Sequence, residues 1–275
     1  MKLSFQKYYF SDSPYLRSVW SMDRIAFITL LCLLPPLGVA LLDKGIALFM
    51  VVILSIVVAF CWQVIFSFVR KRRLGLEWLV TAIIFALFVG ETVPYWQIIL
   101  GLSFGIVIGE QIFGGRGFGF LNPAIVALIF LAFSFSGTTF AEPSPWFAIA
   151  TMTAAIFLVT ARLISWRIIV GLLVGLIGVG LLSGKALQIE MLSGSFIFII
   201  VFLACDPVSS ASTNLGRWIN GLLIGGLAWV FAQTTGMPTQ ADALIPAIFL
   251  ASIFSPLIDT LVVLQNIYVR RRSDA

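Results

Sequence analysis

The chain alternates between long apolar runs and short polar connections. A helix that crosses a membrane needs about 20 mostly apolar residues. Three runs, 77–90, 122–136 and 193–206, have only about 14–15 residues and are predicted to form short or broken helices. The predicted membrane segments are 24–42, 46–69, 77–90, 95–113, 122–136, 145–164, 166–183, 193–206, 216–235 and 241–268.

The two halves of the chain repeat the same order of runs. "YWQIILGLSFGIVIG" (95–109) pairs with "RWINGLLIGGLAWVF" (217–231), and "FLNPAIVALIFLAF" (120–133) pairs with "ALIPAIFLASIF" (243–254). Five runs per half is an odd number, so the second copy has to enter the bilayer upside down. Inverted repeats are typical of transporters, whose sites lie near the middle of the membrane where broken helices meet. We therefore predict an all-α integral membrane protein of about ten transmembrane helices in two inverted five-helix repeats.

Composition agrees with a lipid environment. Of the 275 residues, 60% are hydrophobic and 11% are charged, whereas a soluble domain carries about 25% charged residues. If the N-terminus is cytoplasmic and the ten segments alternate, all 17 Lys and Arg residues except Lys44 and Lys185 lie inside, as the positive-inside rule requires. The net charge of +5 is thus assigned to cytoplasmic loops and not to a nucleic acid partner.

This orientation divides the chain into three parts. We expect a cytoplasmic N-terminal segment (1–23), a single transmembrane domain (24–268) and a basic cytoplasmic tail (269–275). Within the domain, the first repeat covers about 24–136 and the second about 145–268. Both termini are therefore predicted to be cytoplasmic.

Glycines indicate where helices approach closely. Gly101, Gly105 and Gly109 recur every fourth residue, as do Gly171 and Gly175. Small residues at this spacing let helix backbones pack tightly in lipid. The pattern predicts close helix pairs and no particular chemistry.

Several kinds of cofactor site are excluded by composition. The chain has no histidine, which excludes a bis-histidine haem and most histidine-based metal sites. Cys32, Cys61 and Cys205 are far apart and form no C-x-x-C pair, so neither zinc nor an iron–sulfur cluster is indicated. Nothing in the sequence has the layout of a self-contained catalytic site.

Acidic residues stand beside prolines at two matched interruptions. Asp206 ends an apolar run directly before a proline, and Glu91 precedes another proline by three residues. One interpretation is that both helices stop inside the protein and present an acid and backbone groups to a shared cavity. The other is that both acids mark membrane exits and are solvated. Ser209 and Thr213 can ligate a cation beside Asp206, or they can cap the break.

A glycine-rich inner connection forms a second candidate site. In "FGGRGFGFLNPA" (113–124), Asn122 followed by proline is good helix-start chemistry. Free N–H groups at Gly114 and Gly115, with Arg116 adjacent, suit an anionic or carbonyl group such as a flavin phosphate or a quinone. The alternative is a tight interhelical turn.

Long motifs resemble the NqrB/RnfD family, the membrane subunits of the sodium-translocating NADH:quinone reductase and of the Rnf electron-transport complex. They are the stretch from "VTAIIFALFVGETVP" to "GFLNPA" (80–124), "SWRIIVG" (165–171), "DPVSSASTNLGRWINGLLIG" (206–225) and "IFSPLIDTLVVLQNIYVRR" (253–271). The N-terminal "SDSPYLRS" (11–18) looks closer to the Rnf branch, whereas the "FLNPA" and "LQNIYVRR" stretches look closer to the Nqr branch. The resemblance covers nearly the whole chain.

The resemblance implies a ten-helix inverted-repeat fold similar to that of urea channels, in a complex of the bacterial inner membrane. In this family FMN is attached to a threonine in a long outer loop. Here the corresponding connection is only about ten residues, so the chain resembles a short variant without that loop. Its one candidate anchor is Thr139, in "SGTT" (136–139), and an ordinary turn is the alternative. Glu77 and Glu110 stand one residue away from family glutamates, so no role is carried over to them.

Two functions follow. The first is a non-catalytic or redox subunit of an Rnf- or Nqr-like complex, which positions a flavin or quinone beside a pathway for a monovalent cation. Asp206 matches the family acid in its motif, whereas Asp259 is expected to meet an arginine or solvent at the inner face. The second function is a stand-alone channel or transporter for a small solute or cation, with the same fold and no flavin.

Overall fold

The computed structural model describes residues 22–71, 74–90, 93–115, 117–135, 144–184, 193–234 and 240–273, and their elements are all helical. Two short segments, η1 and η3, have the wider π-helical turn. In chain order the elements are α1 (Met22–Arg70), α2 (Glu77–Phe88), α3 (Tyr95–Ile106), η1 (Val107–Gln111), α4 (Pro123–Ser134), α5 (Pro145–Thr160), α6 (Trp166–Leu182), α7 (Gly194–Phe198), η3 (Ile199–Ala204), α8 (Asn214–Thr234) and α9 (Gln240–Ser273).

The element α1 consists of two helices that meet at Gly45. The backbone there has φ 59° and ψ −138°, outside the helical region. A positive φ is inexpensive only for glycine, which has no Cβ to collide with the neighbouring carbonyl. The break falls between the predicted segments 24–42 and 46–69, whose helical character is confirmed.

The predicted short segments are short helices. The elements α2 and α4 have 12 residues each, and α7 continues directly into η3. Among the described residues, three helical stretches are long and apolar enough to cross a membrane, namely 23–70, 214–233 and 242–269. Shorter apolar helices accompany them. An all-α membrane protein is thus confirmed, while ten crossings and the inverted repeat stay predictions.

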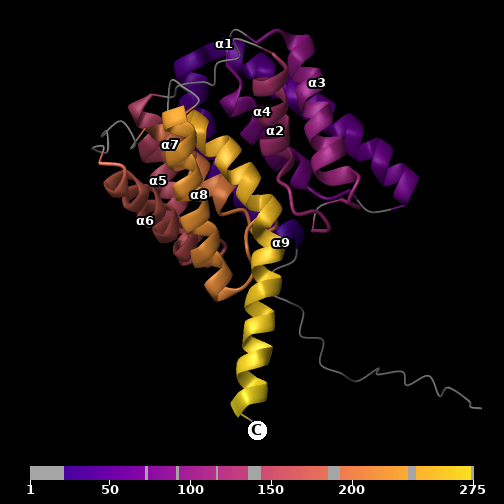
Figure 1. The fold of residues 1–275 in the computed structure, drawn as a ribbon. Coiled ribbons are helices and arrows are strands. Elements are labelled where there is room, and N and C mark those ends of the chain that lie inside the picture. The colour runs from indigo at the N-terminus through magenta and orange to yellow at the C-terminus, as the bar shows by residue number, and fades with distance from the viewer. Residues whose placement is uncertain are drawn as a thin grey trace, which may run out of the picture.

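The helices form two groups that meet along short central helices. Figure 1 shows α1–α4 (indigo to magenta) on one side, α5–α8 (pink to orange) on the other, and α9 (yellow) extending past both. Every residue of α2 from Val80 to Phe88 is buried. The Phe198 ring of α7 lies 5.3 Å from the rings of both Phe88 and Phe147. This aromatic cluster joins the two groups at the centre of the molecule.

Glycine contacts confirm the predicted close helix pairs. A Cβ added to Gly105 of α3 would lie 2.5 Å from the carbonyl oxygen of Pro123 in α4. A Cβ on Gly175 of α6 would lie 2.5 Å from the carbonyl oxygen of Leu222 in α8. Real Cβ atoms are not found at such distances, so only glycine permits these two helix pairs to approach so closely.

Candidate functional site

The start of α4 is fixed by the local sequence. The side-chain oxygen of Asn122 accepts a hydrogen bond from the N–H of Ala124 at 3.0 Å, and Pro123 occupies the first helical position. An asparagine N-cap satisfies one of the N–H groups that a helix start leaves without a partner. The predicted helix-start chemistry is confirmed. Because the side-chain oxygen is held by the cap, the direction of the side-chain nitrogen, Nδ2, is fixed as well.

The Nδ2 atom of Asn122 reaches Asp206, the acid that ends the apolar run in the second half of the chain. It donates to Oδ2 of Asp206 at 3.2 Å, and the hydroxyl of Ser209 donates to the same oxygen at 3.2 Å. All three side chains are buried, and Asp206 is only 6% exposed. A buried carboxylate needs such donors because water no longer solvates it. The structure therefore brings together two residues, 84 positions apart, that the sequence assigned to different sites.

Thr213 lies in a different cluster. The carboxylate of Asp259 in α9 accepts the backbone N–H groups of Ser212 and Thr213 at 2.7 and 3.0 Å. It also accepts both hydroxyls, at 2.9 and 2.6 Å. Asp259 was expected to meet an arginine or solvent; it stays half-buried, and its printed bonds go to the two residues that precede α8. The helix itself is capped by Thr213, whose hydroxyl accepts the N–H of Gly216 at 3.1 Å. A Cβ on Gly216 would lie 2.7 Å from Asp259 Oδ1, so that glycine permits the approach.

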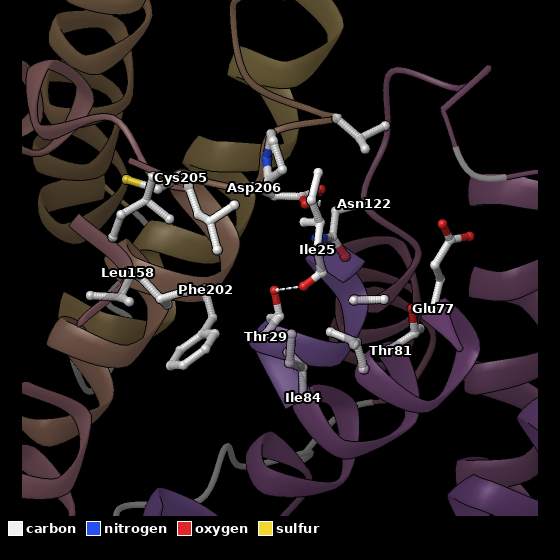
Figure 2. Close-up of a pocket in the computed structure, with 17 residues that line it drawn as sticks. Ile25, Thr29, Glu77, Thr81, Ile84, Asn122, Leu158, Phe202, Cys205 and Asp206 are labelled. Carbon is white, nitrogen blue, oxygen red and sulfur yellow. Dashed lines mark hydrogen bonds between the residues drawn. The ribbon is translucent and has the colours of Figure 1, made fainter. Parts of the chain in front are cut away.

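A small cavity of about 40 Å³ lies beside Asp206. Figure 2 shows Asp206 and Asn122 at one end of it, Phe202 on one wall, and Thr81 with Glu77 on the opposite side. Its lining combines α1 and α2 with α5 and η3, so both helix groups contribute. A site of this size accepts no more than a few water molecules or one small ion.

The glycine-rich connection borders a larger cavity of about 210 Å³. Gly114 and Gly115 have φ values of 116° and 95°, which favour glycine. Their N–H groups donate to the carbonyls of Gln111 and Glu110, each at 3.1 Å. The expectation that these two N–H groups are free to hold a ligand was therefore wrong, because both bond to the last two residues of η1.

Polar side chains of the larger cavity centre on Gln111. The guanidinium of Arg70 donates to its side-chain oxygen at 3.3 Å and also to its backbone carbonyl. The amide nitrogen of Gln111 donates to Gln63 and Glu110, each at 3.2 Å. Arg70 thus supplies the positive charge here among the described lining residues, a role predicted for Arg116, which lies outside the described part of the chain.

Glu77 lies at both cavities. It is the first residue of α2 and it lines both the small cavity beside Asp206 and the larger cavity beside Gly115. The sequence assigned it no role. Asp23 and Glu110 also line the larger cavity, so three acidic residues border it together with Arg70.

Three predicted site residues, Glu91, Arg116 and Thr139, lie outside the described residues. Within the described ranges, no three or more Cys, Asp or Glu side chains gather as a metal-binding group. A cation at Asp206 would therefore need hydroxyl, amide and backbone oxygens besides the carboxylate. Such oxygen donors are the usual ligands of hard cations.

Comparison with known proteins finds relatives that all belong to one family. The model of the NQR2, RnfD, RnfE family matches residues 9–144 and 137–268. A protein of Stutzerimonas stutzeri strain A1501 is 31% identical over 82% of this chain and 69% of its own length. One of Pseudomonas aeruginosa strain LESB58 is 31% identical over 94% and 78%, and one of Yersinia pestis is 32% identical over 76% and 65%. All three carry the name of the same subunit of the Na(+)-translocating NADH-quinone reductase.

Proposed function

This chain belongs to the NQR2, RnfD, RnfE family, and from this premise we propose that it positions a quinone beside a sodium pathway in its complex. It is a membrane subunit of an ion-translocating redox complex. The observation that carries the cation pathway is the buried Asp206 with its donors from both helix groups. Ionisable groups inside a membrane protein are costly and mark ion or substrate paths.

The cation is proposed to bind at Asp206, which lines the small cavity between the helix groups, with the hydroxyl of Ser209 beside the carboxylate. Carboxylate and hydroxyl oxygens suit sodium because it is a hard cation. Glu91 is retained as a proposed member of the same path. Thr213 is not, because its hydroxyl donates to Asp259. The names of the relatives, which contain Na(+), support sodium as the ion.

The proposed topology has ten crossings in two inverted repeats, 24–136 and 145–268, in the bacterial inner membrane. This topology is supported by the described helices, because each predicted segment coincides with one of them. Gly45 divides α1 into the first two predicted segments. With the 1–23 segment and the 269–275 tail in the cytoplasm, Arg70 and the glycine-rich connection face the cytoplasm. The larger cavity then opens on the side from which electrons arrive from NADH.

A flavin phosphate does not fit the larger cavity. Asp23, Glu77 and Glu110 line it alongside Arg70, and three carboxylates would repel a phosphate dianion. A neutral carbonyl is better matched. The guanidinium of Arg70 has five N–H groups, and only some of them are needed for its two hydrogen bonds to Gln111. We therefore assign this cavity to the head group of a quinone. Attachment of FMN at Thr139 is a separate proposal that the absorption spectrum and mass of the purified chain would decide.

The test is NADH-driven sodium uptake by inverted membrane vesicles that contain the assembled complex. The wild-type complex is expected to accumulate ²²Na⁺ with NADH, and Asp206→Asn to abolish uptake while the assembled amount stays unchanged. Uptake that is equal in the variant would refute the site at Asp206. Sodium flux that needs neither NADH nor partner subunits would favour the stand-alone channel instead.

A further inference from the structure

The last helix, α9, continues past the helices that it packs against. Its residue Asp259 accepts hydrogen bonds from Ser212 and Thr213, which directly precede α8. Beyond Asp259, α9 remains helical to Ser273. At 1.5 Å per residue, residues 260–273 add about 21 Å. Figure 1 shows this end of α9 (yellow) projecting past the ends of α6 and α8.

Aromatic and basic side chains mark the inner membrane surface close to Asp259. The rings of Trp166, at the start of α6, and Trp218, in α8, lie 5.6 Å apart. The guanidinium of Arg167 lies 5.5 Å from the centre of the Trp166 ring and donates to Asn214 at 2.8 Å. Tryptophans gather at the level of the lipid headgroups, and basic residues gather on the cytoplasmic side. Because the headgroups form a layer of only about 5–8 Å on each side, an extension of about 21 Å leaves this layer even at a tilt of about 40°.

Apolar side chains form a stripe along the projecting helix. Leu257, Leu261, Leu264 and Tyr268 follow one another at intervals of four, three and four residues, and each is 56–69% exposed. An average interval of about 3.5 residues is the spacing of a seam that packs against another helix. The buried residues of α9 in this region lie on another side of the helix and are Ala251, Ser255, Ile258 and Val262. The stripe, the α9 seam, is therefore not covered by the described part of the chain.

Neither a second copy of this chain nor the membrane surface matches the α9 seam. Two copies in one membrane have the same orientation, so their α9 helices would pair in parallel. The sequence continues after the seam with Arg270–Arg272, and parallel pairing would bring the two arginine runs side by side, where like charges repel. To lie on the lipid surface, the end of α9 would have to fold back. Both prolines of α9, Pro246 and Pro256, come before Asp259, and residues 260–273 contain neither proline nor glycine at which the helix could kink.

We propose that the α9 seam binds an amphipathic helix of another subunit of the complex, outside the membrane on the cytoplasmic side. That helix covers the seam with leucine-type residues at the same interval. It carries acidic residues at the end that meets Arg270–Arg272, because opposite charges then face each other. The inference rests on the proposed orientation, in which α9 ends in the cytoplasm. It also places the inner end of the last membrane segment near Asp259 and not at residue 268.

The first test measures the accessibility of the α9 seam at residue 264. Leu264→Cys is made in a chain whose three native cysteines are replaced by alanine, and it is treated with a membrane-impermeant maleimide in inverted membrane vesicles. We expect the chain expressed alone to be labelled, and labelling in the assembled complex to be at least about tenfold slower, because a docked helix excludes water from the seam. Val263→Cys is the matched control. Val263 is 47% exposed and lies about 100° around the helix from residue 264, so it should be labelled equally fast in both preparations.

The second test measures assembly of the complex. Leu261→Asn together with Leu264→Asn should lower the amount of partner subunits that co-purify with the chain about tenfold, because central apolar anchors carry most of the binding energy of an interface. The Tm of the chain purified alone should stay unchanged, since both side chains are exposed there. Val263→Asn together with Val269→Asn removes two exposed apolar side chains outside the seam and should leave assembly unchanged.

The outcomes separate this inference from the proposed orientation. If Leu264→Cys in the chain expressed alone is not labelled in vesicles of either orientation, the seam lies in lipid and the inference is refuted. It is also refuted if labelling is equally fast in the complex, or if a disulfide between two chains through residue 264 identifies a second copy as the occupant. Labelling only in right-side-out vesicles would instead contradict the proposed orientation itself.

Discussion

Asn122 makes two hydrogen bonds that different substitutions can separate. Its oxygen caps α4 and its nitrogen binds Asp206. Asn122→Ser keeps an oxygen that can cap the helix, but the shorter side chain cannot reach Asp206. Asn122→Ala removes both bonds. Asn122→Asp keeps the cap and puts a second carboxylate against the first.

The bond types set the expected losses in the free energy of unfolding. An N-cap contributes about 1 kcal/mol, and a hydrogen bond to a charged group about 1.5–3 kcal/mol. Asn122→Ser should therefore cost about 1.5–3 kcal/mol and Asn122→Ala about 2.5–4 kcal/mol. In Asn122→Asp, two charges at the present 3.2 Å repel by about 5 kcal/mol at an effective dielectric constant of about 20, in addition to the lost bond.

The assay is thermal unfolding of the detergent-solubilised protein, followed by circular dichroism. At about 2–4 °C per kcal/mol, Asn122→Ala is expected to lower Tm by about 5–15 °C, Asn122→Ser by less and Asn122→Asp by most. Asn214→Ser is the control, because the side chain of Asn214 accepts a bond from Arg167 at the exposed surface, where such contacts contribute little. A Tm for Asn122→Asp at or above that of Asn122→Ser would refute the reasoning.

Three further substitutions test other parts of the fold by the same measurement. Gly175→Val should destabilise by about 1–3 kcal/mol, because its side chain would overlap Leu222 of α8; Gly178→Val, with open space around its Cβ position, should not, and equal losses would contradict the close-packing argument. Asp259→Asn should cost about 1.5–3 kcal/mol by weakening the bonds to Ser212 and Thr213 ahead of α8; an unchanged Tm would show that these bonds are dispensable. Gly45→Ala should cost about 1–3 kcal/mol through its positive φ, and no loss would mean that the turn adapts.

Hydropathy and local chemistry were sufficient to predict the helices. The apolar runs ended within a few residues of the observed helix ends, as at 145–164 for α5 (Pro145–Thr160) and 166–183 for α6 (Trp166–Leu182). The Asn122 cap was also predictable, because an N-cap depends only on residues next to it in the chain. These features are set by short-range interactions.

The partners of the polar residues were not predictable in the same way. Asn122 and Asp206 are 84 residues apart, and Thr213 and Asp259 are 46 apart, so their meeting depends on how whole helices pack. Proximity in sequence had placed Thr213 with Asp206. The unsatisfied hydroxyl of Thr81 was not predictable either, since an isolated threonine in an apolar run is ordinary until the described residues are seen to offer its hydroxyl no partner.

The contact between Asn122 and Asp206 has a thermodynamic consequence. It joins the α1–α4 group to the connection that follows η3 in the other group, so an ion that competes with the amide for the carboxylate weakens the junction between the groups. Linkage makes this effect reciprocal: any event that separates the groups changes ion affinity by the same factor. If electron transfer shifts the groups by even the length of one hydrogen bond, the ion's affinity must change with it.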